Sequence, residues 1–90
     1  MKHIEVSVKV ENTLGLHARP ASMLVRKANS FQSEITLTGA SGSGNCKSVL
    51  DLLMLAAGRD TVLKLTAEGT DAEEAVREIA GMFRNKFGEE

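Results

Sequence analysis

His17 is the side chain in this sequence whose neighbours best suit covalent chemistry. It lies in the run Leu14–Ala21, LGLHARPA, which also holds Arg19. A neutral imidazole is a nucleophile near neutral pH, and a phosphoryl group on one of its nitrogens keeps a high transfer potential. The guanidinium of Arg19 matches phosphoryl oxygens in charge and in hydrogen-bond geometry. This segment therefore suits a site that accepts a phosphoryl group and passes it on, and the alternative is that His17 is merely a polar residue in the N-cap region of a helix.

The residues after His17 predict that a helix begins there. Pro20 suits only the first turn of a helix, where its missing N–H would have no partner. Apolar residues recur at helical spacing at Ala18, Ala21, Leu24, Val25 and Ala28. We therefore expect free backbone N–H groups and the positive end of the helix dipole beside the ring, which disfavour imidazolium and suit a bound phosphate. Gly15 would allow a tight turn that leaves the ring open to a partner.

Alternating apolar and polar residues predict the strands that must support this site. The alternation is clear over 3–10, 34–38 and 62–67. The glycine-rich segment 39–44 predicts a loop or a hairpin, with a further strand beside it. Strands this short, each with one apolar face, favour an antiparallel sheet covered by helices on one side.

Two more helices are expected in the second half of the chain. A short apolar helix is predicted over 48–56, with Ser48 as its N-cap. Asp71 and Glu74 fit a start that resembles a capping box, followed by an apolar stripe at Ala72, Ala75, Val76, Ile79 and Met82 or Phe83. Arg84 and Lys86 would lie in the last turn, where positive charge suits the helix dipole.

Composition narrows the classes of function. The 90 residues predict one domain, 1–90, with an ordinary globular share of 42% hydrophobic and 26% charged residues. The chain has no Trp and no Tyr, which disfavours a platform for stacking bases, and its net charge of −1 disfavours nucleic acid or an anionic membrane as partner. No apolar run reaches the roughly 20 residues that cross a bilayer.

The cysteine and histidine content predicts neither a metal nor a cofactor. Cys46 is the only cysteine, so an internal disulfide is excluded and a reducing cytoplasm is the expected compartment. One cysteine and two distant histidines give no metal-ligand spacing. Cys46 itself is expected to be a small buried or half-buried residue, and the exposed face of a strand is expected for His3.

Two segments together resemble a known family. Gly15–Ala21, GLHARPA, resembles the active-site signature of HPr, the histidine-containing phosphocarrier of the bacterial phosphoenolpyruvate-dependent phosphotransferase system. Lys47–Leu53, KSVLDLL, resembles the family's regulatory serine segment at the family's separation, and the resemblance continues through Ala67–Asp71 and the last helix. It implies an α+β fold, an open-faced β-sandwich whose four-stranded antiparallel sheet carries three helices on one face.

The resemblance also implies a covalent carrier rather than a true enzyme. His17 would take a phosphoryl group from phospho-enzyme I on the ring nitrogen nearer the backbone, giving pros-phosphohistidine, and deliver it to an enzyme IIA domain. Arg19 would assist the transfer. The residues that would support the phosphate are Gly15, Ala18 and Pro20. The resemblance thus implies a monomer that carries phosphate either for sugar transport or for regulation.

Ser48 would be the site of an inhibitory phosphate added by an HPr kinase/phosphorylase. A phosphoserine at a helix N-terminus meets free N–H groups and the favourable end of the dipole. A plain helix cap is the alternative for Ser48, and Lys47 could steady a phosphate or simply be solvated.

The short helix also predicts a docking surface. Val49, Leu52 and Ala56 would face the sheet, and Met54 is assigned to the core. Leu50 and Leu53 would then be exposed near His17, as apolar docking residues are. The residues expected beside them are Met23, Lys27 and Lys47.

Leu14 departs from the pattern of sugar-transport carriers, which often have a small polar residue before the glycine. With Asn12–Gly15 and the segment 83–87, Leu14 indicates the nitrogen-related branch, NPr, which regulates rather than feeds sugar uptake. The departure at Leu14 argues against a role in sugar uptake but not against phosphorylation of the chain.

Three other classes of function fit the sequence less well. A P-loop needs its Lys and Ser directly after the last glycine, whereas Asn45 and Cys46 separate Gly44 from Lys47. A small acid–base enzyme could use His17 as its base, but no companion nucleophile is evident and an open sandwich offers little pocket. A non-catalytic binding module of the same topology, with His17 incidental, is the remaining alternative.

Overall fold

The four strands of the chain form one antiparallel sheet, and three of them alternate apolar and polar residues. The computed structural model describes residues 2–90. The strands lie in the order β1-β4-β2-β3, and their bounds are β1 Lys2–Lys9, β2 Glu34–Gly39, β3 Gly42–Asn45 and β4 Val62–Gly69. Leu65 of β4 pairs with Val6 of β1 on one side and with Leu37 of β2 on the other, so apolar side chains form a row on one face. The three strands predicted from alternation are confirmed.

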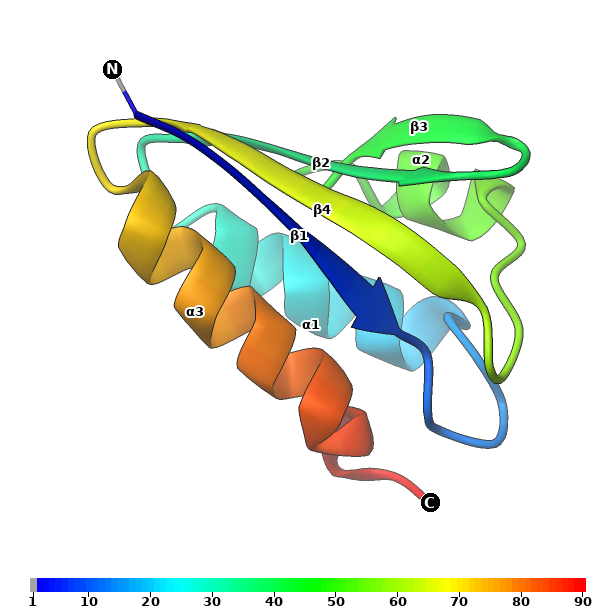
Figure 1. Cartoon of the computed structure of the whole chain (residues 1–90). Helices are drawn as coiled ribbons and strands as arrows, with labels where there is room; N and C mark the ends of the chain where they lie inside the picture. Colours follow the sequence, from blue (N-terminus) through cyan, green and yellow to red (C-terminus); the bar gives the residue numbers. More distant parts are fainter. Residues whose placement is uncertain (1) are drawn as a thin grey trace.

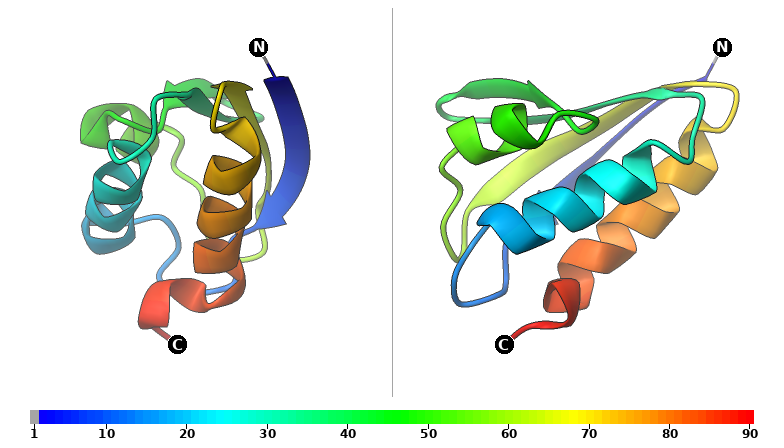
Figure 2. Two further views of the ribbon diagram at one scale, coloured as in Figure 1. Left: turned by 90° about the vertical axis from the view of Figure 1, so that its left-hand side faces the viewer. Right: turned by 180° about the vertical axis from the view of Figure 1, so that it is seen from behind.

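All three helices cover the same face of the sheet. They are α1 Ala18–Ala28, α2 Val49–Met54 and α3 Ala72–Arg84, and a short 3-10 helix, η1, follows at Lys86–Gly88. Figure 1 shows α1 and α3 below the sheet and α2 beside the hairpin of β2 and β3, and both views of Figure 2 agree. The open-faced sandwich with a four-stranded sheet that the sequence indicates is therefore confirmed.

The core lies between the sheet and the helices. Leu65 of β4, Leu24 of α1 and Ile79 of α3 are each fully buried there. Burying a side chain of this size contributes about 1.5–3 kcal/mol relative to leaving it exposed. Since the single cysteine, Cys46, is free, this packing rather than a cross-link holds the layers together.

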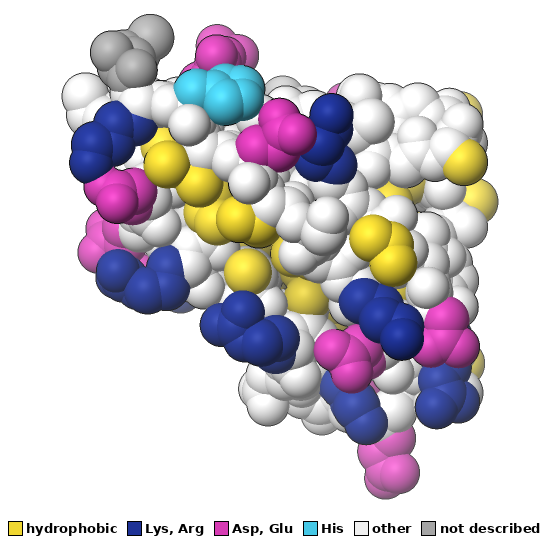
Figure 3. Space-filling model, in the orientation of Figure 1, with side chains coloured by type: hydrophobic (Ala, Val, Ile, Leu, Met, Phe, Trp, Pro, Cys, Tyr) yellow, Lys and Arg dark blue, Asp and Glu magenta, His cyan; other side chains and the backbone are white. Residues whose placement is uncertain are grey.

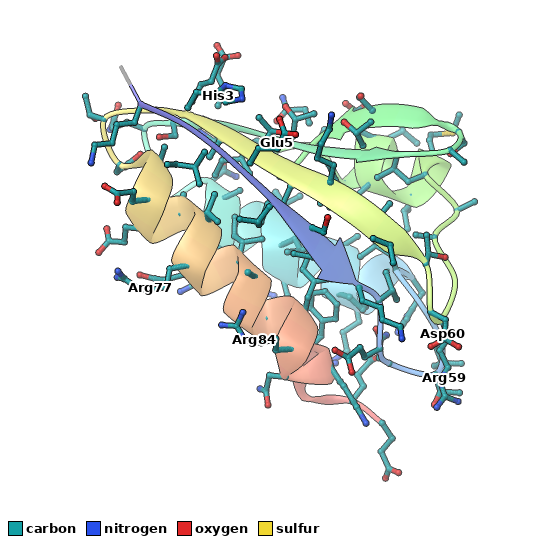
Figure 4. The ribbon with its side chains drawn as sticks, in the orientation of Figure 1. His3, Glu5, Arg59, Asp60, Arg77 and Arg84 are labelled. Carbon is teal, nitrogen blue, oxygen red and sulfur yellow. The ribbon has the colours of Figure 1, made fainter. Side chains whose placement is uncertain are left out.

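The outer face of the sheet is polar. His3 and Glu5 project from β1 on this face (Figure 4), and His3 is exposed, as predicted. The Nδ1 atom of His3 lies 3.0 Å from the Glu68 carboxylate, and this hydrogen bond raises the pKa of His3 above its ordinary value. In the view of Figure 3, acidic and basic side chains are interspersed rather than gathered by sign.

The glycine-rich segment forms a tight hairpin. Gly39 pairs with Gly42, so Ala40 and Ser41 make the turn. The choice between loop and hairpin, which composition left open, is thus settled in favour of the hairpin.

The short helix α2 ends earlier than predicted. Ser48 is its N-cap, and the Ser48 hydroxyl accepts a hydrogen bond from the Asp51 N–H at 3.2 Å. The last helical residue is Met54, because Ala56 has φ +51° and so lies in the left-handed region. The helix predicted over 48–56 is therefore confirmed at its start and wrong at its end.

Asp71 precedes α3 but does not form the predicted capping box. Its side chain makes no capping bond; instead it accepts hydrogen bonds from the backbone N–H groups of Gln32 and Ser33 and from the Ser33 hydroxyl. The capping-box prediction failed because the loop before β2 supplies better donors than the first turn of α3. Asp71 thus joins two parts of the chain that sequence places far apart.

Two further findings concern the described residues as a whole. Within residues 2–90, no helix combines the length and apolar character that a membrane crossing requires. In the same residues, no three His, Cys, Asp or Glu side chains come together in a way that could hold a metal ion.

We predict that Asp71→Asn lowers the free energy of unfolding at neutral pH. The Ser33 hydroxyl, with the amides of Gln32 and Ser33, lowers the pKa of Asp71, and such a carboxylate stabilises the fold above its unfolded-state pKa. This contribution is lost as the pH falls through the lower pKa of the folded state. Urea denaturation across this range should show the variant's deficit shrinking on acidification, whereas Glu74→Gln, at the other predicted capping-box position, should show little deficit at any pH.

Candidate functional site

His17 lies directly before α1, as predicted. It is the N-cap residue, with extended backbone (φ −85°, ψ −171°), and its side chain makes no capping hydrogen bond. Pro20 has no N–H, so the first turn offers the amides of Ala18 and Arg19 as donors without helical acceptors. The imidazole is 34% exposed, and it therefore lies partly open to solvent near the positive end of the helix dipole.

The loop before His17 is seated against the segment that follows α2. The Leu16 N–H donates to the Ala57 carbonyl oxygen at 2.8 Å, and Leu16 is buried. Gly15 has φ +73°, and a Cβ atom at Gly15 would lie 2.7 Å from that same oxygen and 2.9 Å from the Gly58 Cα. The position suits only glycine, so the predicted tight turn at Gly15 is confirmed.

The imidazole of His17 contacts a carboxylate from the far end of the chain. Its Nε2 atom lies 3.0 and 2.9 Å from the two carboxylate oxygens of Glu89. Among the described residues, no hydrogen-bond partner is found for the Nδ1 atom. One ring nitrogen is thus engaged, while the nitrogen nearer the backbone is left available.

The Glu89 carboxylate forms hydrogen bonds with three side chains. Besides His17, the Arg19 guanidinium donates to it at 2.8 Å and the Asn12 amide donates at 2.9 Å. These partners, His17 first among them, hold the pKa of the Glu89 carboxyl below its ordinary value, although partial burial opposes the shift. The side chain is only 15% exposed, so an ionised carboxylate is held inside the site.

Asn12 stabilises the loop before His17 through hydrogen bonds made by its buried side chain. It is fully buried, and its amide nitrogen donates both to the Gly15 carbonyl oxygen at 2.7 Å and to Glu89 at 2.9 Å. Its amide oxygen has no partner among the described residues. One side chain therefore ties the turn at Gly15 to the carboxylate beside His17.

Arg19 is placed for a double role. Through Nη1 it donates to Glu89 and to the Phe87 carbonyl oxygen at 3.1 Å, and its side chain is otherwise about half exposed. The structure records hydrogen bonds only at Nη1. The remaining N–H groups of the guanidinium are consequently available to an anion beside His17.

The segment after α3 carries Glu89 to the site. Lys86 lies in η1, outside the last turn of α3 where it was predicted, and both Lys86 and Phe87 have positive φ, +55° and +54°. The buried ring of Phe87 packs edge-on against Phe83, with 4.9 Å between centroids. The Glu90 carbonyl oxygen also accepts a 2.6 Å hydrogen bond from the Thr13 N–H. Figure 2 shows this segment turning back toward the start of α1.

Two predicted phosphate-supporting residues differ in burial. Ala18 is the first residue of α1 and is exposed, which corrects its assignment to the apolar face of that helix. Pro20 is fully buried instead and anchors the first turn. Both lie within the first turn, as the sequence indicates.

Ser48 and Lys47 both make structural contacts. Ser48 is half-buried and caps α2, as described above. The Lys47 ammonium donates to the Phe31 carbonyl oxygen at 2.9 Å. Lys47 is therefore neither free in solvent nor directed at the Ser48 hydroxyl in this structure.

The exposed side of α2 is apolar. Leu50 is 69% exposed and Leu53 38% exposed, as predicted, whereas Met54, assigned to the core, is 73% exposed. The assignment of Met54 was wrong because Leu52 and Leu55, three residues apart, take the inward positions, which turns Met54 outward. We call Leu50, Leu53 and Met54 the α2 patch.

The other inward assignments of α2 are mixed. Leu52 is fully buried and Val49 packs partly buried against the core. Ala56 was expected to face the sheet but is exposed, because the helix ends before it.

Met23 and Lys27 lie on the side of α1 that faces α3. Met23 packs partly buried against the core, and Lys27 forms an ion pair with Glu78 at 3.1 Å. Both line a groove of about 360 Å³ between α1 and α3, whose other lining residues are Arg26, Ser30 and Met82. His17 is not among the residues that line this groove.

Cys46 is fully buried, as predicted. Burial raises the pKa of its thiol to about 12. Since the thiolate is the reactive form of cysteine, Cys46 is a packing residue at neutral pH.

Sequence reasoning missed Glu89 and gave Asn12 no role at the site. Glu89 follows the last periodic helix, in a segment without a pattern of its own. Asn12 lies in an irregular loop, where an amide side chain has many possible partners. The one usable signal was a buried-type residue, Phe87, just before Glu89, which indicates that the segment returns to the core.

Comparisons with known proteins agree on one family. A family model described as "PTS HPr component phosphorylation site" matches residues 4–85. The phosphocarrier protein HPr of Neisseria meningitidis is 37% identical over 96% of this chain and 97% of its own length. The HPr of Mycoplasma pneumoniae is 45% identical over 92% of this chain and 93% of its own. A crystal structure of HPr from Thermoanaerobacter tengcongensis covers 100% of this chain and 99% of its own, with 40% identity and a TM-score of 0.91.

We predict that Gly15→Ala destabilises the protein by about 1–3 kcal/mol, because the left-handed backbone and the close approach of Ala57 both disfavour a Cβ atom. Gly58→Ala is the matched control, since a Cβ at Gly58 meets nothing within 4 Å. Urea denaturation should place Gly58→Ala within about 0.5 kcal/mol of the wild type. Equal stability of the two variants would contradict this account of the turn.

Proposed function

The chain belongs to the HPr family of phosphocarriers of the bacterial phosphotransferase system, and we propose that His17 is the residue on which it carries the phosphoryl group. The observation that supports this most directly is the state of the ring. Its Nε2 is engaged by Glu89, no residue among 2–90 bonds to its Nδ1, and the imidazole is 34% exposed at the start of α1. A partner can therefore reach a nucleophilic nitrogen without unfolding anything.

The proposed transfer is a pair of displacements at phosphorus. The Nδ1 lone pair attacks the phosphorus of phospho-enzyme I, and the bond that held phosphorus on enzyme I breaks as the new phosphorus–nitrogen bond forms. The N–H groups in the first turn of α1 and the free N–H groups of Arg19 bind the phosphoryl oxygens. An enzyme IIA domain then takes the group by the reverse step, which restores the neutral ring.

The α2 patch is the proposed docking surface for these partners. Its exposed residues Leu50, Leu53 and Met54 lie on a helix that packs against α1, and Leu14, three residues before His17, is also exposed. Exposed apolar side chains of this kind suit transient protein partners. We further propose a monomer that acts in the cytoplasm, in keeping with the buried, reduced Cys46.

The exposed Leu14 supports assignment to the nitrogen-related branch. A bulky apolar residue here cannot donate or accept a hydrogen bond beside the site, and it enlarges the apolar surface offered to a partner. The sugar branch is the alternative.

Ser48 is the proposed site of regulation. Its hydroxyl is half-buried and caps α2 through the Asp51 N–H. A phosphate there would keep an acceptor for that N–H and add negative charge beside the α2 patch, which would oppose docking.

To test the carrier role, the protein is incubated with phosphoenolpyruvate and enzyme I. We expect one phosphoryl group per chain, labile to acid and stable to base, with ³¹P NMR assigning it to the Nδ1 atom. His17→Ala should give no label above background.

The matched control is His3→Gln, which removes the other histidine from the exposed face of β1 and should label like the wild type. Label retained in His17→Ala would rule out the assignment. A wild-type protein that takes no label would favour the binding module in which His17 is incidental.

The role of Ser48 is tested with ATP and a competent HPr kinase. We expect an acid-stable phosphate on the wild type and none on Ser48→Ala, and we expect the phosphorylated protein to accept phosphate from enzyme I at least about 10-fold more slowly because of the added charge. If the kinase leaves Ser48 unmodified, Ser48 is a helix cap and nothing more.

A further inference from the structure

Three side chains of the segment 12–19 converge on one carboxylate from the far end of the chain. Glu89 accepts hydrogen bonds from Asn12 at 2.9 Å and from Arg19 at 2.8 Å, and both of its oxygens lie within 3.0 Å of His17 Nε2. The family model matches residues 4–85, so Glu89 lies outside the residues that this model matches. The role of the contact between Glu89 and His17 is therefore inferred from its geometry.

The direction of the hydrogen bond between His17 and Glu89 follows from charge. The pKa of the Glu89 carboxyl is lowered by its partners, so the group is a carboxylate at neutral pH. A carboxylate only accepts hydrogen bonds, and Nε2 must therefore carry the hydrogen. In a neutral imidazole with hydrogen on Nε2, the lone pair lies on Nδ1.

We propose that Glu89 is a positioning residue for phosphoryl transfer, which holds His17 in the tautomer and orientation that present the Nδ1 lone pair to the incoming phosphorus. The proposal rests on the carrier role of His17 proposed above. It assigns to a residue outside the matched region the task that a carboxylate performs for a histidine in hydrolytic triads. Glu89 itself does not touch the phosphoryl group.

Charge adds a second contribution to this role. When the Nδ1 lone pair forms its bond to phosphorus, positive charge spreads over the ring to Nε2, which keeps its hydrogen. The Glu89 carboxylate, at 2.9 Å from Nε2, stabilises that charge. Arg19 can serve at the same time, because its bond to Glu89 uses Nη1 and leaves other N–H groups for phosphoryl oxygens.

The backbone conformation after α3 places Glu89 beside His17. Two successive non-glycine residues, Lys86 and Phe87, adopt the left-handed conformation that L-residues rarely take. The burial of Phe87 against Phe83 and the Thr13–Glu90 backbone hydrogen bond offset this strain. These contacts fix the position of Glu89 from both sides, and only 15% of its side chain remains exposed.

The test compares Glu89→Ala, Glu89→Gln and the control Glu90→Gln, which changes the neighbouring exposed carboxylate. The first readout is the tautomer of neutral His17, from ¹⁵N–¹H correlation spectra of the unphosphorylated protein. We expect hydrogen on Nε2 in the wild type, in Glu90→Gln and in Glu89→Gln, whose amide oxygen can still accept. Glu89→Ala should give a mixture of tautomers.

The second readout is the single-turnover rate of phosphoryl transfer from phospho-enzyme I. Glu89→Ala should be slower by about 10-fold or more, in the range usual for losing the partner that orients a histidine. Glu89→Gln should fall between Glu89→Ala and the wild type, because it keeps the tautomer but not the charge. Urea denaturation and backbone amide spectra check that each variant is folded.

Two results would overturn the role of Glu89. One is a wild-type neutral ring with its hydrogen on Nδ1; the other is a folded Glu89→Ala that transfers phosphate at the wild-type rate. Either result leaves the carrier role intact if His17→Ala still takes no label. Since the tautomer is measured without enzyme I, failure of the carrier role would be seen separately, as label that persists in His17→Ala.

Discussion

The hydrogen bond from the Leu16 N–H to the Ala57 carbonyl oxygen determines where the site lies. It seats the loop before α1 against the segment after α2, and Gly15 makes that approach possible because it has no Cβ. The chain then enters α1 with His17 as the N-cap, so the ring is neither drawn into the core nor released to solvent. The position of α2, and with it the α2 patch, depends on the same contact. One backbone interaction thus relates the His17 ring to the surface proposed for docking.

The second constraint is the return of the chain after α3. The proposed transfer uses a ring with one nitrogen engaged and one open, and the engaged nitrogen of His17 meets a residue more than seventy positions away. Phe87 makes this possible, because its buried ring fixes the segment while Glu89 stays at the surface of the site. Asn12 then links this carboxylate to the turn at Gly15. The contacts that hold the fold together here are therefore also those of the proposed site, and we expect a change at either Phe87 or Asn12 to affect both.

Much of this architecture could be predicted because it follows from local rules. Alternation revealed the strands, and Pro20 with the helical spacing after it placed the start of α1 beside His17. The failures came where a distant segment decided the outcome. Asp71, for example, bonds to Ser33 instead of capping its own helix. Glu89 was missed for the same reason, since no local pattern reveals which buried loop a segment after the last helix will meet.

The burial of Cys46 has a practical side. Its thiol has a pKa of about 12 and no exposed surface, so maleimides and iodoacetamides should pass over it at neutral pH. A cysteine introduced at an exposed position would then be the only one to react. A single fluorophore or spin label could therefore be attached to that new cysteine without replacing Cys46 in the core.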